Sequence, residues 1–265
     1  MSHQRHPSTT SNADRWIESP HRNPRAECRL FCLPYAGGSA TIYRTWQKSM
    51  PQTIEVIPLH LPGRGRRMKE PPVNDLMQMA RQLTDDLLPV FRQKPFAFFG
   101  HSMGATISYE VARILRDERG PQPLALMVSG RQAPHLPDAF EPTYHLPHDE
   151  FVQQLRRLNG TPQAILDCAE LMELMIPLLR ADFEAIEKYV CRPGDPLDCP
   201  IFAFGGDQDT DIAPEHIEAW GQHTSAEFRM KMFSGDHFFL HPQEQALLSD
   251  LGRELERRRR ASVTL

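Results

Sequence analysis

Apolar residues follow two alternating patterns along the chain. Short apolar runs predict buried strands, and longer stretches with an apolar residue every three or four positions predict amphipathic helices. The predicted strands cover residues 28–33, 54–59, 95–99, 123–129, 200–204 and 227–233. The predicted helices cover residues 75–91, 103–115, 214–222 and 243–259, with a further one around Ile42, Tyr43 and Trp46. This alternation predicts an α/β fold, a mostly parallel sheet with helices on both faces. Asn74 is the expected cap of the helix at 75–91.

Residues 131 to about 194 interrupt the alternation. A loop-like stretch leads to a short helix at 151–158 and to an unusually apolar helical stretch at 164–189, which Pro177 should kink or break. Because this segment falls between two strands, we expect an inserted helical lid whose apolar inner wall receives a hydrophobic part of a substrate. A plain core helix is the alternative. The candidate substrate-binding residues are Met172, Met175, Leu179 and Phe183.

The length of 265 residues suits one well-buried domain. We place it at 27–260, between a flexible N-terminal tail (1–26) and a short C-terminal tail (261–265). The N-terminal stretch lacks the apolar core of a signal peptide, and no segment is apolar enough to span a membrane. The net charge of −4 gives no sign of nucleic-acid binding. The basic run 257–260 is most simply the solvated end of the last helix.

The cysteine pattern excludes two kinds of site. The five cysteines have neither zinc-site nor disulfide-framework spacing. Cys28 and Cys32 would lie on one face of the first strand as small core residues. We therefore expect reduced thiols, a cytoplasmic protein, no metal and no other cofactor. We also expect a monomer.

The pentapeptide Gly100-His101-Ser102-Met103-Gly104 lies between a predicted strand and a predicted helix. In that context Gly-x-Ser-x-Gly is typical of a nucleophilic serine on a sharp turn, where a glycine on each side relieves crowding. The same pattern arises by chance in ordinary turns, but the flanking elements favour the nucleophile. His101 cannot readily turn back onto its neighbour, so we expect it to form a local hydrogen bond.

A serine hydroxyl becomes a useful nucleophile when a base takes its proton, and that base needs a carboxylate to orient it. In sheets of this type both partners come from loops after later strands, in the order serine, acid, histidine. His237 is the candidate base, and His241 is a weaker alternative. Asp209 is the candidate acid, and Asp207 and Asp211 are close alternatives in the same turn.

Acyl transfer also needs two backbone donors for the developing oxyanion. One should be the amide of Met103, at the start of the helix after the serine. The other should be the amide of Ala36, in the glycine-rich turn 34–38 after the first strand. The alternative for that turn is a simple glycine-rich connection.

Several motifs together resemble the external (type II) thioesterases of nonribosomal peptide and polyketide assembly lines. These motifs are Leu33–Ser39, Leu61–Gly65, Gly100–Gly104, Gly206–Asp209 and Gly235–Leu240, and Leu178–Phe183 resembles the lid region of the family. The resemblance runs from about residue 28 to about residue 255. It implies an α/β-hydrolase fold with a helical lid and a triad of Ser102, Asp209 and His237.

The resemblance also implies a reaction, which is the hydrolysis of acyl thioesters from the 4′-phosphopantetheine arm of carrier proteins. In such enzymes this clears misprimed or stalled carriers, or releases product or intermediates, and the carrier is a transient partner. A stand-alone esterase or lipase acting on small esters is an alternative with the same triad. An acyltransferase and a non-catalytic binding module are further alternatives, although the intact serine, acid and histidine argue against the last.

Overall fold

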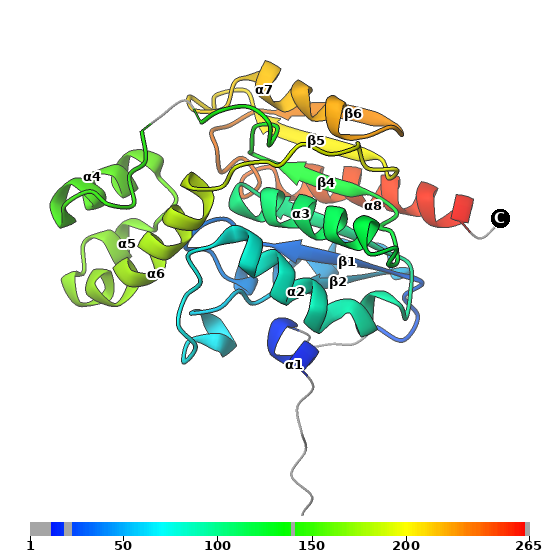
Figure 1. Ribbon diagram of the computed structural model, residues 1–265, viewed down its shortest axis with the longest axis horizontal. Coiled ribbons are helices and arrows are strands. Elements are labelled where there is room, and N and C mark those ends of the chain that lie inside the picture. The colour runs from blue at the N-terminus through cyan, green and yellow to red at the C-terminus, as the bar shows by residue number, and fades with distance from the viewer. Residues whose placement is uncertain (1–11, 19–22, 139–140, 263–265) are drawn as a thin grey trace, which may run out of the picture.

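The computed structural model describes residues 12–18, 23–138 and 141–262. Six strands form one parallel sheet in the order β2-β1-β3-β4-β5-β6 (Figure 1). They are β1 (Cys28–Leu33), β2 (Ile54–Pro58), β3 (Phe96–His101), β4 (Leu126–Ser129), β5 (Ile201–Gly206) and β6 (Phe228–Phe233). The predicted α/β fold with a parallel sheet is confirmed, and every predicted strand is present.

Helices cover both faces of this sheet (Figure 1). One face carries α2 (Leu76–Phe91), α3 (Met103–Asp117) and α7 (Pro214–Glu218), and the other carries α8 (Glu244–Ser262). Because successive side chains of a strand point to opposite faces, Phe98 joins the cluster under α2 and α3, whereas Phe99 joins the cluster under α8. Cys28 and Cys32 are buried together in the second cluster, as expected for small core residues.

Two predicted helical features differ in the structure. The residues around Tyr43 and Trp46 form two 3-10 turns, Ala40–Tyr43 and Trp46–Lys48, instead of an amphipathic α-helix. The two rings still contact one another, with their centroids 4.7 Å apart. The cap of α2 is Asp75 and not the predicted Asn74, because the Asp75 carboxylate accepts a hydrogen bond from the amide of Gln78 while the Asn74 side chain donates to Glu184.

The N-terminal segment packs further into the domain than we expected. Helix α1 (Asn12–Trp16) lies against α2, with the ring of Trp16 fully buried and its Nε1 atom donating to Asp86 at 2.7 Å. Ile17 forms an isolated bridge with Leu59 next to β2. These residues therefore belong to the folded domain, in contrast to the flexible tail predicted for 1–26. Residues 1–11, 19–22 and 263–265 lie outside the described residues.

Between β4 and β5 the chain forms a helical insertion at one end of the sheet (Figure 1). It consists of α4 (His148–Leu158), α5 (Gln163–Leu166) and α6 (Ala169–Glu187). Pro177 does not break α6, which continues through it, and the interruption falls earlier, at 167–168. The insertion has a hydrophobic cluster of its own, whose buried members are Phe151, Leu155, Leu166, Met172, Ile176 and Leu179. We call this insertion the lid.

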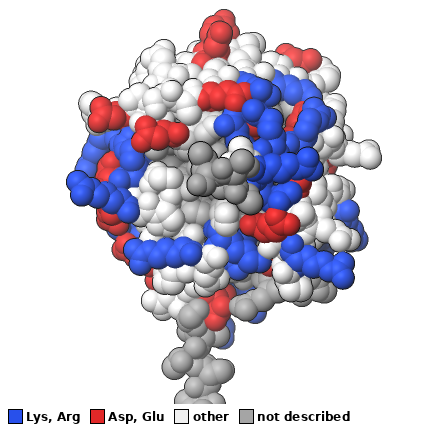
Figure 2. Space-filling view, turned by 90° about the vertical axis from the view of Figure 1, so that its right-hand side faces the viewer, with Lys and Arg blue, Asp and Glu red and all other residues white. Residues whose placement is uncertain are grey.

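Figure 2 views the molecule from the end at which α8 finishes, where basic and acidic side chains mix. The basic run at 257–260 continues α8 as predicted. Arg257 and Arg258 form ion pairs with Glu227, and Arg259 pairs with Glu27 and Glu256. The run is thus offset by acidic partners. Among the described helices, none has both the length and the apolar character needed to cross a membrane.

Candidate active site

Ser102 occupies the sharp turn between β3 and α3. Its backbone has φ 52° and ψ −118°, a conformation that costs a non-glycine residue about 1–3 kcal/mol and persists where the surroundings enforce it. A Cβ atom on Gly100 would lie 2.1 Å from the carbonyl oxygen of Gly104, and Gly104 itself faces β1 at similarly close range. Both glycines are therefore required for the turn, as the motif indicated.

His237 and Asp209 lie in the loops after β6 and β5. The Nδ1 atom of His237 is 2.7 Å from Oδ2 of Asp209, whose Oδ1 accepts the amides of Asp211 at 2.9 Å and Ile212 at 3.1 Å. Burial alone would raise the pKa of Asp209, but the hydrogen bond and charge of His237 and the two amides outweigh it and hold that pKa below its ordinary value of 3.8. This carboxylate is therefore ionised at neutral pH and fixed in orientation.

The two alternative acids have other partners. The Asp207 carboxylate accepts the amide of Gly235 at 3.0 Å, which ties together the two loops. Asp211 pairs with Arg157 of the lid helix α4 at 3.0 Å. The pairing with histidine supports Asp209 as the acid.

The other histidines near the site are also engaged elsewhere. His241 lies with its Nε2 atom 3.2 Å from the hydroxyl of Tyr35. His101 is fully buried, and its Nδ1 atom is 2.9 Å from the hydroxyl of Ser129, so it forms the expected local hydrogen bond. Burial lowers the pKa of His101 well below its ordinary value, and this side chain stays neutral. Neither ring competes with His237 for the base.

The turn after β1 presents its backbone to the same site. Ala36 lines one cavity together with Ser102 and His237. The amide of Gly37 donates to Asp182 at 2.7 Å and that of Gly38 donates to the carbonyl of Tyr35 at 2.9 Å, so both are already used. The amide of Ala36 precedes them in the turn. Met103 begins α3, where first-turn amides have no acceptor within the helix.

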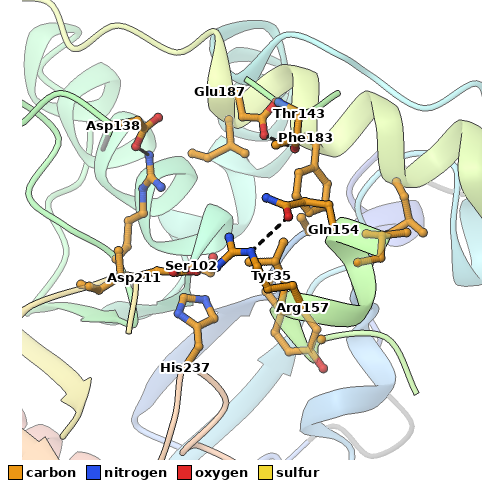
Figure 3. A pocket seen from close by; sticks show the side chains of 18 of the residues that line it. Tyr35, Ser102, Asp138, Thr143, Gln154, Arg157, Phe183, Glu187, Asp211 and His237 are labelled. Carbon is orange, nitrogen blue, oxygen red and sulfur yellow. Dashed lines mark hydrogen bonds and ion pairs between the residues drawn. The ribbon is translucent and has the colours of Figure 1, made fainter. Parts of the chain in front are cut away.

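The cavity extends from Ser102 under the lid (Figure 3). Of the four candidate substrate-binding residues, Leu179 and Phe183 line it. Met172 is instead buried in the hydrophobic cluster of the lid, and Met175 packs against that cluster. All four residues thus belong to the lid cluster or pack against it, and Leu179 and Phe183 line the cavity as well. No group of three or more metal-ligating side chains occurs among the residues described.

Comparison with known proteins identifies the family to which this chain belongs. The model of the thioesterase domain family matches residues 28–255. This chain belongs to the thioesterase family.

Named relatives place this thioesterase more closely. It is 49% identical over 244 residues to the linear gramicidin dehydrogenase LgrE of Brevibacillus parabrevis, covering 91% of this chain and 92% of LgrE. It is 41% identical over 245 residues to the gramicidin S biosynthesis protein GrsT of Aneurinibacillus migulanus, covering 92% and 95%. The solved structure of the type II thioesterase BorB from the borrelidin biosynthetic cluster has a TM-score of 0.80 at 37% identity, covering 91% and 98%. The resemblance to type II thioesterases and the α/β-hydrolase fold are confirmed.

The thioesterase cavity also has a polar part that sequence analysis missed. Arg131 forms an ion pair with Asp138 at 2.9 Å, and Arg157 donates a hydrogen bond to the side-chain oxygen of Gln154 at 3.0 Å (Figure 3). These side chains come from the loop after β4 and from α4, and they line the cavity beside its apolar residues. Neither their spacing nor their residue types distinguish them in the sequence, because loops and solvated helix faces elsewhere in the chain also contain arginine, aspartate and glutamine.

Proposed function

We propose that this thioesterase hydrolyses acyl groups from the 4′-phosphopantetheine arm of a carrier protein. In a nonribosomal peptide or polyketide pathway this would clear misprimed or stalled carriers, or release product or intermediates. The observation that carries the proposal is His237, which pairs with Asp209 and lines the same cavity as the strained Ser102 in a chain of this family. Family membership alone would leave the catalytic residues open.

The geometry suggests the order of the steps. Asp209 holds the proton of His237 on Nδ1, which leaves the Nε2 lone pair free to take the proton of Ser102. The serine oxygen then attacks the thioester carbonyl, and the amides of Ala36 and Met103 stabilise the resulting oxyanion. When that intermediate collapses, the carbon–sulfur bond breaks and His237 returns its proton to the leaving pantetheine sulfur.

Water completes the cycle. His237 takes a proton from a water molecule, whose oxygen attacks the acyl-enzyme carbonyl through a second oxyanion. The bond to Ser102 breaks, the serine regains a proton from His237, and the acyl group leaves as a carboxylic acid. Every proton in this sequence moves between substrate, water and these side chains. We further propose that the enzyme works as a monomer in the cytoplasm, where its five free thiols stay reduced.

A panel of acyl groups tests this function. Acetyl, aminoacyl and short peptidyl groups are loaded on a phosphopantetheinylated carrier protein, and release of free acid is compared with hydrolysis of the matching small oxoester. We expect kcat/KM to be at least about tenfold higher on the carrier, since the arm and carrier supply binding energy that small esters lack. Equal rates on both would instead identify a stand-alone esterase, and acyl transfer to an added amine would identify an acyltransferase.

The name of LgrE raises a second activity that the same mixtures can test. A dehydrogenase acting on a carrier-bound acyl group would consume NADPH, whereas hydrolysis leaves it unchanged. The Ser102, His237 and Asp209 arrangement suits hydrolysis, so we expect free acid without NADPH oxidation. NADPH loss that depends on the acyl carrier would overturn this proposal.

A further inference from the structure

A buried carboxylate links the lid to the turn that carries Ala36. Asp182 belongs to α6 and is fully buried, one residue before the cavity-lining Phe183. Its Oδ2 atom accepts the amide of Gly37 at 2.7 Å. The lid therefore supplies an acceptor for the backbone next to the proposed oxyanion donor.

Arg64 neutralises this carboxylate and holds the same turn from its other side. Its two terminal nitrogens each lie 2.6 Å from one oxygen of Asp182, in a bidentate pair. Arg64 is also buried, and it donates to the carbonyl of Gly38 at 3.2 Å and to that of Pro62. The turn thus donates the Gly37 amide to Asp182 and accepts from Arg64 through the Gly38 carbonyl, so a single buried ion pair holds it from both sides.

The lid helix also packs closely against the turn beside this pair. Gly37 has φ 74°, and a Cβ atom there would lie 2.5 Å from Cδ2 of Leu179 on α6. By contrast, the links of α4 to the catalytic loops are the half-exposed pair Arg157–Asp211 and a 3.4 Å contact between Asn159 and Asp236. Pairs of that kind contribute little. The lid is therefore fixed to the turn at α6 and held loosely at α4.

We propose that Asp182 is a positioning residue of the oxyanion hole, and this inference rests on the function proposed above. By holding the Gly37 amide it fixes the peptide between Ala36 and Gly37, and with it the direction of the Ala36 amide. Arg64 makes this possible, because an unpaired carboxylate so near the hole would oppose the negative charge that develops there. Lid helix α6 is then part of the catalytic frame as well as a cover.

Two double variants separate positioning from simple loss of an ion pair. Arg64→Gln with Asp182→Asn removes both charges but keeps an acceptor for the Gly37 amide. Arg64→Leu with Asp182→Leu removes both charges and the acceptor. Neither leaves an unpaired buried charge, which is the change that most often prevents folding. Arg29→Leu with Glu55→Leu serves as the control, because it deletes a largely buried ion pair that joins β1 to β2.

The readouts are kcat, KM and the rate at which a fluorophosphonate labels Ser102, since its phosphoryl oxygen occupies the oxyanion hole. For the leucine pair we expect kcat and the labelling rate to fall by about 10²-fold, as for loss of an oxyanion donor. KM should change by less than about threefold, because the interaction lost acts in the transition state. The amide pair and the control should keep kcat within about fivefold of the parent enzyme.

Equal activity of the two double variants would overturn the inference, whether both stay active or both lose activity. Labelling, and hydrolysis of a small activated ester, need no carrier protein. If the parent enzyme is labelled and cleaves that ester but leaves acyl carriers intact, the proposed function fails while the comparison of variants still decides the role of Asp182.

Discussion

Gly104, in the first turn of α3, stands directly against Leu33, the last residue of β1. A Cβ atom at position 104 would lie 2.2 Å from the carbonyl oxygen of Leu33 and 2.8 Å from that of Pro34. This contact joins the helix that begins with Met103 to the strand that leads into the turn with Ala36. The spacing of the two proposed oxyanion donors is thus set by two backbones in contact.

Gly104→Ala should therefore cost activity out of proportion to its size. The added methyl group must push α3 and β1 apart, at about 1–3 kcal/mol of overpacking. A displacement of about 1 Å between oxyanion donors should lower kcat by about 10²-fold. Gly221→Ala is a matched control, because a Cβ there would lie 3.2 Å from the Phe228 ring and its three nearest neighbours include no backbone atom. Steady-state kinetics on an activated ester would measure both, and a Gly104→Ala enzyme as active as the control would refute the argument.

Ser102→Ala should abolish hydrolysis and leave the fold unchanged. The hydroxyl makes no capping hydrogen bond to α3, so its loss should change the free energy of unfolding by less than about 0.5 kcal/mol. Turnover should fall by on the order of 10⁶-fold, as for other hydrolases that lose a serine nucleophile. Thermal unfolding and acid release from an acyl carrier would be measured together. Residual hydrolysis near the parent rate would exclude Ser102 as the nucleophile.

Asp209→Asn should lower kcat by about 10⁴-fold, because an amide stabilises the wrong tautomer of His237. Asp207→Asn is the matched control from the same turn, since its carboxylate accepts the Gly235 amide and does not touch the histidine. We expect that control to stay within about tenfold of the parent enzyme. The reverse ranking of the two variants would move the acid to position 207.

These assignments show which parts of the site follow from local sequence. The strands, the serine turn and the His237 loop can be predicted, because each is a short stretch whose structure depends on apolar periodicity or glycine placement within a few residues. Among the three aspartates of one turn, local sequence favours Asp209 but does not exclude Asp207 or Asp211. The choice depends on which carboxylate the amides of Asp211 and Ile212 turn toward the histidine.

The pairing of Arg64 with Asp182 could not be predicted at all. The two residues are 118 positions apart, one in a basic loop and the other in an apolar helix, where a charge ordinarily faces solvent. The lid residues show a similar limit. Helical spacing groups side chains by face, but it does not show that Leu179 and Phe183 line the cavity as well as the lid cluster, whereas Met172 belongs to the cluster and does not line the cavity.

Substitutions on α6 should separate these two roles. Phe183→Ala removes a cavity wall, so kcat/KM for hydrophobic acyl groups should fall by about tenfold or more while acetyl is less affected. Met172→Ala removes a buried side chain of the lid cluster, which should cost about 2–5 kcal/mol of stability without altering the ranking of acyl groups. The acyl-carrier panel and thermal unfolding measure both. Identical acyl rankings for Phe183→Ala and the parent enzyme would remove Phe183 from the binding site.

A histidine outside the catalytic site should make stability depend on pH. His223 connects the hydroxyl of Tyr109, 2.7 Å from its Nδ1 atom, with His135, 2.7 Å from its Nε2 atom. Burial, together with the positive charges of His135 and Arg113, lowers the pKa of His223 from 6.5 to about 4. The folded protein therefore resists taking up a proton that the unfolded chain accepts.

The sign of the effect follows from proton linkage. As pH falls from 6.5 toward about 4, the unfolded chain binds a proton at this position before the folded protein does, so the free energy of unfolding decreases. Below that window the group contributes no further loss. His223→Asn keeps an acceptor for Tyr109 but cannot titrate. The free energy of unfolding of this variant should therefore fall less steeply with decreasing pH over the same window, by a slope that corresponds to at most one bound proton. Urea unfolding of both proteins across the window measures the two slopes. Parallel slopes would mean that His223 titrates alike in the folded and unfolded chains, and that the link to His135 and Tyr109 does not hold it neutral.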